Sequence, residues 1–352
     1  MARIEQWGKK ISSYAIPIGI IAAAFIFFYW YVIAASFFDA FWRSITVLIV
    51  TYPFILKYAA PYFLAAGIER ARRAGIIFKD KASLEDLDRA NVIVFNKSGT
   101  LTVGLPEITD FVVFDDTLPL IEALHLAASL ESKSAHPLAR AIVEKGKTLA
   151  RGLATPFEYK EVAGMGVSGV VNGKHIEIGN LSFLEGLAEG GLRGQQDIGF
   201  GKFQNEGKTV VFMFVEKKLT ALIAFSDAFR PFAKEAVAAL ATLGKEVVLL
   251  TGDNKKTAEA IARQLNITTV RAEVFPQDRA RIIEELQGVV AVVEKNEIRM
   301  GMNIVMFASD DIRSVVFAFA NSKRTTRAVK FAIIGQFLWY VIAFGALILF
   351  RV

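Results

Sequence analysis

Three long apolar runs constrain the fold of this chain more than any other feature of its sequence. Residues 15–35 contain no charged side chain, and residues 331–350 form a second charge-free run near the opposite end. Another apolar run, residues 44–68, is interrupted by two prolines and by Lys57. About 20 apolar residues are enough for a helix to cross a bilayer. The sequence therefore predicts a membrane anchor of three transmembrane helices.

Clusters of basic residues indicate on which side of the membrane these runs end. Lys9 and Lys10 precede the first run, three arginines within 70–73 follow the second, and four basic residues within 323–330 precede the third. Segments that stay in the cytoplasm close to a membrane span carry such an excess of Lys and Arg. The predicted anchor has a cytoplasmic leader at residues 1–14, a two-helix hairpin at 15–68 and a third helix at 330–352.

The apolar runs and basic clusters predict an integral, multi-pass membrane protein whose soluble domains are cytoplasmic. We expect its membrane to be a prokaryotic inner or plasma membrane. The basic clusters account for the net charge of +6, so no nucleic-acid partner is expected. The chain contains no cysteine, which excludes disulfides, thiolate metal sites and a cysteine nucleophile. Three histidines are too few for a histidine-rich site, and no structural metal is predicted.

The soluble part begins with a short apolar segment that is followed at once by a polar loop. Val92–Phe95 is typical of a buried parallel strand, and the Ser-Gly-Thr sequence after it can turn sharply and present N–H groups to an anion. The loop resembles the phosphorylation motif Asp-Lys-Thr-Gly-Thr of heavy-metal-transporting P-type ATPases. The matching residues are Asn96, Lys97, Ser98, Gly99 and Thr100. Because an amide is not a nucleophile, Asn96 cannot form the acyl phosphate that the family's aspartate forms.

Other motifs match the same family, in the same order, over nearly the whole chain. Ser134–Ala139 resembles its histidine–proline motif, and Asp227–Pro231 resembles its hinge into the phosphorylation domain. The resemblance implies an ATP or ADP site formed by Glu131, His136, Gly164, Gly166 and Asn180. It also implies a loop that contacts phosphate and helps to position nucleotide and Mg²⁺, formed by Thr251, Gly252 and Asp253.

Strands that alternate with helices on both sides of a separate insert imply a parallel sheet. The resemblance implies a cytoplasmic α/β domain of the haloacid-dehalogenase-like, Rossmann-type fold, carrying an α+β nucleotide-binding insert. The predicted boundaries are residues 69–102 and 221–329 for the phosphorylation-like domain and 103–220 for the insert. Within the insert, the glycine-rich residues 184–207 are predicted to form a loop.

Two further departures from the family weaken the predicted phosphoryl-transfer site. Arg279 stands where the family has a lysine, and it keeps the positive charge but not the compact geometry. The family's Mg²⁺-holding segment, Gly-Asp-Gly-x-Asn-Asp, is missing after Val293, where Glu294 is the nearest carboxylate. Phosphoryl transfer needs Mg²⁺ to neutralise developing charge. We therefore predict no catalytic residue, and whether the chain binds Mg²⁺ stays open.

The membrane part departs from the family as well. Tyr52, Pro53 and Phe54 stand where the family has the metal-transporting Cys-Pro-Cys motif. Soft metal ions prefer soft sulfur ligands, so copper or zinc transport through this segment is not expected. The family's actuator domain has no counterpart in the sequence. Lys57 lies within an apolar run without an acidic neighbour, and aromatic residues crowd the same runs, which favours other membrane subunits as partners.

The sequence as a whole favours a catalytically inactive, P-type-ATPase-like membrane subunit with a structural or regulatory role in a larger complex, one that retains nucleotide binding. Two alternatives stay open. One is a regulatory subunit that senses ATP or ADP. The other is part of a split metal-ion-transporting ATPase.

Overall fold

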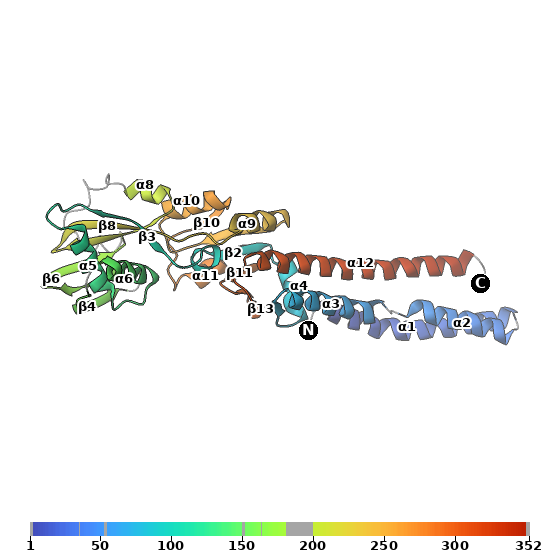
Figure 1. The fold of residues 1–352 in the computed structure, drawn as a ribbon. Helices are drawn as coiled ribbons and strands as arrows, with labels where there is room; N and C mark the ends of the chain where they lie inside the picture. The colour runs from blue at the N-terminus through green and yellow to red at the C-terminus, as the bar shows by residue number, and fades with distance from the viewer. Residues whose placement is uncertain are drawn as a thin grey trace. The chain divides into compact units, whose positions relative to one another are not determined.

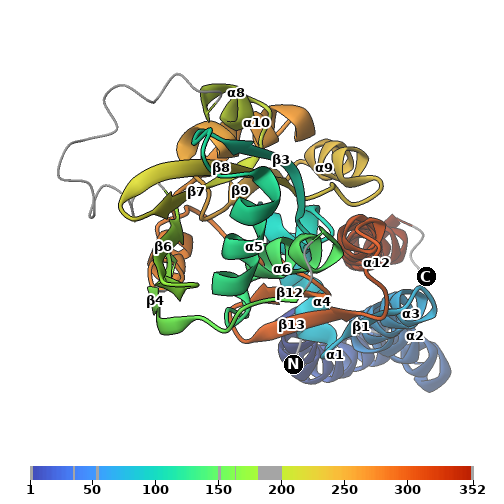
Figure 2. The same ribbon diagram turned by 60° about the vertical axis from the view of Figure 1, so that its left-hand side comes forward.

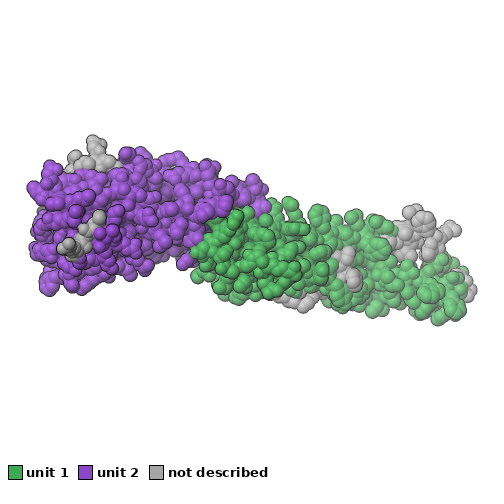
Figure 3. Space-filling model, viewed as in Figure 1, with its two compact units in different colours: residues 1–91, 296–352 green, residues 92–295 purple. Residues whose placement is uncertain are grey.

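The computed structural model describes residues 3–34, 36–52, 55–149, 152–162, 164–180 and 200–349 of the chain. Figure 1 gives the order of its elements. The chain divides into two compact units, coloured separately in Figure 3: residues 1–91 with 296–352, and residues 92–295. The second unit holds the segment around Asn96 together with the whole predicted insert.

The first unit combines helices with a small antiparallel sheet. Its helices are α1 (Arg3–Ala34), α2 (Phe37–Thr51), the π-helix η1 (Ile55–Ala59), α3 (Ala60–Arg73), α4 (Lys81–Arg89) and α12 (Arg313–Leu349). Its strands are β1 (Ile76–Phe78), β12 (Glu297–Met300) and β13 (Asn303–Phe307), with β13 pairing antiparallel to both others. None of these three strands was predicted from the sequence.

Within the described residues, one segment is long and apolar enough to cross a membrane: Ser13–Ile33 of α1, with a mean hydropathy of 2.2. The sequence predicts three such helices, so the number is a correction. The predicted leader also differs, because residues 3–14 contain no proline to end a helix and form the first turns of α1.

The predicted second span, residues 44–68, is not one helix. It is divided among α2, η1 and α3. Tyr52 ends α2 with an extended backbone (ψ 123°), as expected of the residue before a proline. Pro53 and Phe54 lie outside the described residues. The third predicted run forms the end of α12, and its side chains from residue 343 onward also lie outside them.

A close helix–helix contact joins α3 to α12. Gly67 has no room for a side chain, because a Cβ atom there would lie 2.4 Å from Oγ1 of Thr325. The Asn321 side chain donates to the Gly67 carbonyl at 2.9 Å, and Arg70 donates to Asn321 at 3.2 Å and to Thr325 at 3.0 Å. These polar contacts fix the register of the two helices, since the buried side chain of Asn321 in α12 finds its partners, Gly67 and Arg70, on α3.

The second unit is built on the predicted parallel sheet. Its strands, in spatial order, are β11 (Val290–Glu294), β2 (Val92–Asn96), β9 (Glu246–Leu250) and β10 (Thr269–Arg271), all parallel. Its helices are α9 (Ala233–Thr242), α10 (Lys255–Leu265) and α11 (Arg279–Glu284). Val92, Val94 and Val248 are buried in the core beneath this sheet. These elements confirm the α/β architecture.

The insert is a six-stranded antiparallel sheet with helices packed against it (Figure 2). Its strands, in spatial order, are β3 (Glu107–Val113), β8 (Lys218–Ser226), β7 (Thr209–Val215), β6 (Lys174–Gly179), β5 (Gly166–Val171) and β4 (Phe157–Val162). Its helices are α5 (Leu120–Glu131), α6 (Pro137–Leu149) and α8 (Phe200–Asn205). Of the predicted glycine-rich loop 184–207, residues 184–199 lie outside the described residues, and 200–205 are helical because Phe203 is buried against β7 and β8.

The contact at Gly67 leads to a stability prediction. Replacing glycine by alanine within a helix normally stabilises it by about 0.5–1 kcal/mol. We expect Gly67→Ala to destabilise the chain instead, by about 1–3 kcal/mol, because the new methyl group overlaps Thr325. Thermal unfolding in detergent measures the effect.

Gly335→Ala in α12 is the matched control, because no atom lies within 4 Å of the position of its Cβ. That variant should be neutral or stabilising. The double variant Gly67→Ala with Thr325→Ala should recover part of the loss. Equal unfolding temperatures for Gly67→Ala and Gly335→Ala would contradict the contact.

Candidate functional site

The parallel sheet brings three predicted site segments to the same edge. Asn96 is the last residue of β2, Thr251 follows β9, and Glu294 is the last residue of β11. Asn96 lies in register with Leu250, and Phe95 with Val293. Ligands of open α/β sheets bind beyond the carboxyl ends of the strands. This edge is therefore where a phosphate group or a metal ion would bind.

At this edge, the side chain of Arg279 joins those of Asn96 and Glu294. Nη2 of Arg279 donates to Oδ1 of Asn96 at 2.5 Å and lies 3.3 Å from Oε1 of Glu294. The Asn96 amide donates to the same Glu294 oxygen at 3.4 Å. Arg279 and Glu294 are each about one-third exposed, at 36% and 32%. The two oxygen-bearing side chains thus share one guanidinium group.

This arrangement does not fit the Mg²⁺ ion that phosphoryl-transfer chemistry requires. Mg²⁺ binds through carboxylate oxygens in octahedral geometry. Glu294 is the carboxylate that reaches Asn96, and a permanently charged guanidinium lies beside both. No group of three metal-ligating side chains is found in the described part of the chain. Between Glu294 and Asn303 the chain forms β12, whose carboxylate, Glu297, pairs with Arg299.

A second polar network lies beside the first. Nζ of Lys97 contacts Oδ2 of Asp253 at 2.5 Å, and both side chains are about one-tenth exposed. The hydroxyls of Thr251 and Thr209 donate to the same carboxylate at 2.7 and 3.0 Å. Burial alone would raise the pKa of Asp253, but the Lys97 charge and these hydrogen bonds hold it below the ordinary value. Asp253 is therefore engaged within the protein, and Thr209 ties the insert to the parallel sheet.

The connections between sheet and insert are held by the residues of the predicted hinge. The Asp227 carboxylate accepts from the Thr102 hydroxyl at 2.6 Å and from the backbone N–H groups of Gly104 and Leu105 at 3.0 and 3.2 Å. Arg230 donates to the carbonyl of Gly99 at 3.0 Å. Gly99 has a φ of +75°, which a side chain would strain, so the loop needs glycine there.

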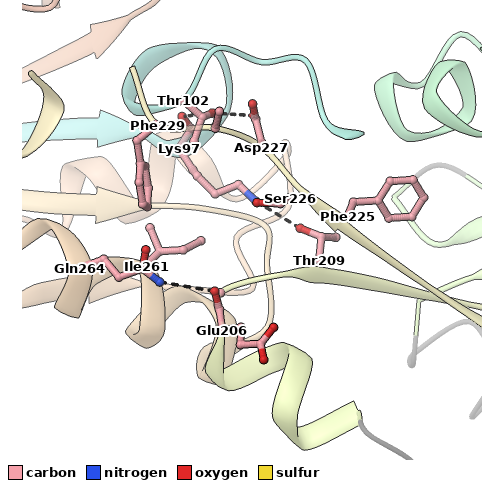
Figure 4. A pocket seen from close by; sticks show the side chains of 12 residues that line it. Lys97, Thr102, Glu206, Thr209, Phe225, Ser226, Asp227, Phe229, Ile261 and Gln264 are labelled. Carbon is pink, nitrogen blue, oxygen red and sulfur yellow. Dashed lines mark hydrogen bonds between the residues drawn. The ribbon is translucent and has the colours of Figure 1, made fainter. Parts of the chain in front are cut away.

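A pocket of about 190 Å³ opens beside these connections (Figure 4). In Figure 4, Lys97 bonds to Thr209, Thr102 to Asp227, and Gln264 to the backbone of Glu206. The polar side chains of Lys97, Thr102 and Gln264 that line the pocket are thus already hydrogen-bonded to other groups of the protein. We interpret the pocket as part of the junction between sheet and insert.

The five predicted nucleotide-binding residues lie within the insert. Asn180 donates through its side chain to the carbonyl of Gly164 and through its backbone to that of Met165, each at 2.9 Å. Gly166 pairs with Gly179 across β5 and β6. The hairpin therefore brings Asn180 to the two glycines, and Gly164 has the φ of +75° that favours glycine.

Glu131 and His136 form the other part of this site. Glu131 ends α5 with 7% of its surface exposed, and His136 precedes α6 with Nδ1 accepting from the Leu138 N–H at 3.2 Å. Both lie near Glu161 of β4, a residue that the sequence reasoning missed. Glu161 lies in register with Val167, beside Gly166. The sequence signal that could have identified Glu161 is its position just before the glycine motif of Gly164 and Gly166.

A family model for haloacid dehalogenase-like hydrolases matches residues 90–311, which include the parallel sheet and the insert. The chain belongs to this family. The match agrees with the α/β fold of the second unit.

Curated relatives extend the similarity of this haloacid dehalogenase-like protein toward both ends. A probable copper-exporting P-type ATPase of Archaeoglobus fulgidus is 32% identical over 366 residues, which cover 97% of this chain and 45% of the relative. A copper-exporting P-type ATPase of Staphylococcus aureus is 36% identical over 296 residues, covering 81% of this chain and 35% of the relative. The chain is homologous to heavy-metal P-type ATPases over most of its length and spans less than half of these relatives.

A solved structure agrees at the level of the fold. The crystal structure of a zinc-transporting PIB-type ATPase in the E2.Pi state superimposes with a TM-score of 0.63. It is 23% identical, and the match covers 95% of this chain and 61% of the other.

The Lys97–Asp253 pair gives a testable stability prediction. Asp253→Asn should destabilise the chain by about 3–5 kcal/mol, because it leaves the ammonium group of Lys97 buried without its counter-charge. Glu259→Gln, which removes an exposed pair with Lys255, should cost less than about 1 kcal/mol. Chemical denaturation at neutral pH measures both.

The same pair predicts a dependence on pH. Because the folded-state pKa of Asp253 is lowered, its contribution is complete above the ordinary aspartate pKa and is lost as the pH falls through the lowered value. The two variants should therefore converge in stability in acid. A gap between them that stays constant down to strongly acidic pH would contradict this assignment.

Proposed function

We propose that this chain is a catalytically inactive, P-type-ATPase-like membrane subunit that retains nucleotide binding and serves a structural or regulatory role in a larger complex. The observation that carries the proposal is the cluster of Asn96, Arg279 and Glu294. It supplies neither a nucleophile nor a seat for a divalent cation. The proposed ligand is ATP or ADP, held by the insert.

The chemistry of the cluster supports inactivity in two independent ways. The Asn96 amide carries no lone pair suited to attack on a phosphorus atom, so no acyl phosphate can form. Arg279 pairs with Glu294, which is the carboxylate that reaches Asn96. The cluster therefore lacks the set of available carboxylate oxygens that would hold Mg²⁺.

The membrane-facing residues support a role other than metal transport. Tyr52 stands where the resemblance places a metal-binding thiolate, and its hydroxyl accepts a hydrogen bond from Lys57 at 3.2 Å. The Lys57 ammonium also lies 5.4 Å from the centre of the Tyr58 ring. A cationic side chain with phenol partners is a poor ligand set for a soft metal ion. We therefore propose that no copper or zinc ion is carried through this segment.

The helices α1 and α2 expose many large aromatic side chains, including Phe25, Phe28, Phe38 and Trp42, at 64–72% of their surface. We propose that lipid and other membrane subunits cover them. Tight nucleotide binding with no partner would favour the alternative of an ATP or ADP sensor. The alternative of a split metal pump requires turnover, which the next experiment measures.

The purified chain should form no acyl phosphate with γ-³²P-ATP and Mg²⁺. Acid gels should show no hydroxylamine-sensitive band, whereas a full-length copper-exporting relative prepared in parallel should show one. Asn96→Asp alone should also give no band, because Arg279 would pair with the new carboxylate and no second metal ligand is gained. A hydroxylamine-sensitive band from the unaltered chain would refute the proposed inactivity and favour a split pump.

The sides of the membrane on which the two ends of the chain lie can be tested by cysteine labelling, because the chain has no cysteine of its own. Single cysteines at positions 2 and 352 should react from opposite sides, the first only after the cytoplasm is opened. Purification in mild detergent should recover additional subunits. Labelling of position 352 only after opening would contradict the topology, and a monodisperse monomer from native membranes would contradict the accessory-subunit role.

A further inference from the structure

Glu131 is an acidic side chain buried without a partner. It is 7% exposed, and burial and the charge of Glu161 act on its carboxyl group without a hydrogen bond from the described residues. Burying an ionised carboxylate without compensation is costly, and such a group takes up a proton instead. Asp253, by contrast, is a buried acid of this unit whose charge is compensated by Lys97 and by two hydroxyl donors.

The groups around Glu131 oppose its ionisation. Glu161 and Tyr159 face it from β4, and the Tyr159 hydroxyl donates to the Glu161 carboxylate at 3.1 Å. His136 faces the same region, but partial desolvation lowers its pKa and its Nδ1 is occupied as an acceptor. Lys133, in the turn after α5, and Arg140, in α6, are exposed. Glu131 therefore faces a negative charge and no compensating positive one.

We propose that Glu131 binds the base of an adenine nucleotide as a neutral carboxylic acid, and that Glu161 is the positioning residue that keeps it neutral. The inference rests on the nucleotide-binding part of the proposed function. It adds a protonation state, a base preference and a dependence on pH to that site.

The chemistry of the two purine bases gives this protonation state a consequence for specificity. A neutral carboxylic acid offers one O–H donor and one carbonyl acceptor, whereas an ionised carboxylate offers acceptors only. The Watson–Crick edge of adenine presents an acceptor at N1 and a donor at its amino group, which matches the neutral acid. The same edge of guanine presents two adjacent donors, which match the ionised form. A buried polar group that lacks its partner is strongly penalised, so the neutral form selects adenine.

Glu131 ionises in a pH range in which the preference for adenine over guanine can be measured. Burial first, and the charge of Glu161 second, raise the pKa of Glu131 to about 7. A ligand that binds the protonated form has full affinity below this pKa and loses affinity as the pH rises above it. Adenine-nucleotide affinity should therefore decrease by about tenfold between about pH 6 and about pH 8.

Calorimetric titration of the full chain in detergent with ATP and with GTP, over this pH range, tests the proposal. The unaltered chain should prefer ATP and should lose ATP affinity as the pH rises. Glu131→Gln, whose amide is a permanent donor–acceptor pair, should keep the preference for ATP and lose that part of the pH dependence. The phosphates of ATP titrate equally in both measurements, so the difference between the two proteins reports Glu131.

Two further variants distinguish the effect of the Glu161 charge on Glu131 from the effect of any other carboxylate on the same strand. Glu161→Gln should move the fall in ATP affinity to lower pH, because removing the neighbouring charge lowers the pKa of Glu131. Glu158→Gln, an exposed carboxylate on the same strand, should behave as the unaltered chain does.

Three outcomes would contradict the proposal, and each identifies a different part of it as wrong. Affinity that rises with pH, with loss of ATP binding in Glu131→Gln, would show the ionised form binding and would overturn the inference. ATP binding without any dependence on Glu131 or pH would overturn it while leaving nucleotide binding intact. Absence of binding at every pH would overturn the nucleotide-binding part of the proposed function together with this inference.

Discussion

The guanidinium group of Arg279 lies between the two side chains on which phosphoryl transfer at this sheet edge would depend. It donates to Asn96 and pairs with Glu294, and these residues end two adjacent parallel strands. A fixed cation in contact with the amide and the carboxylate gives the edge a stable charge balance without metal. The loop after β2 keeps its turn at Gly99, and the Thr100 hydroxyl accepts from the backbone of Lys295 at 3.1 Å. The geometry of a phosphate loop is thus retained while its reactive groups are internally satisfied.

The two polar sites of the second unit differ in how completely they are satisfied. Around Asp253, each carboxylate oxygen has a donor, and Thr209 links the insert to the parallel sheet. Around Glu131, the carboxyl group has no such donor, and Glu161 adds a like charge. A satisfied buried network stabilises one arrangement, whereas an unsatisfied buried acid is stable only as a neutral group or with a ligand. This contrast is why we assign a structural role to the first site and a binding role to the second.

Much of the second unit could be predicted from the sequence, because local signals and packing agree there. The sequence pattern favours a helix over residues 255–265, and α10 has those bounds. Asn254 caps its start by accepting from the Thr257 N–H, and Asn266 ends it in a left-handed conformation. The strand at Glu246–Leu250 is equally clear as a short apolar run. The antiparallel strands β12 and β13 were not predicted, because residues 294–309 were interpreted only as the remnant of a missing segment. The predicted second span also differs, because an apolar length does not show where a helix breaks around a proline.

The side-chain clusters were less accessible to sequence reasoning. Arg279 and Glu294 were each singled out, but their contact across the sheet edge depends on how α11 follows its loop. A direct measurement of the central claim is the binding of Mn²⁺, a paramagnetic substitute for Mg²⁺, followed by water-proton relaxation. The account predicts that the unaltered chain and its Glu294→Gln variant bind Mn²⁺ equally, because Arg279 already holds that carboxylate. A Mn²⁺ site in the unaltered chain that disappears in Glu294→Gln would contradict the account.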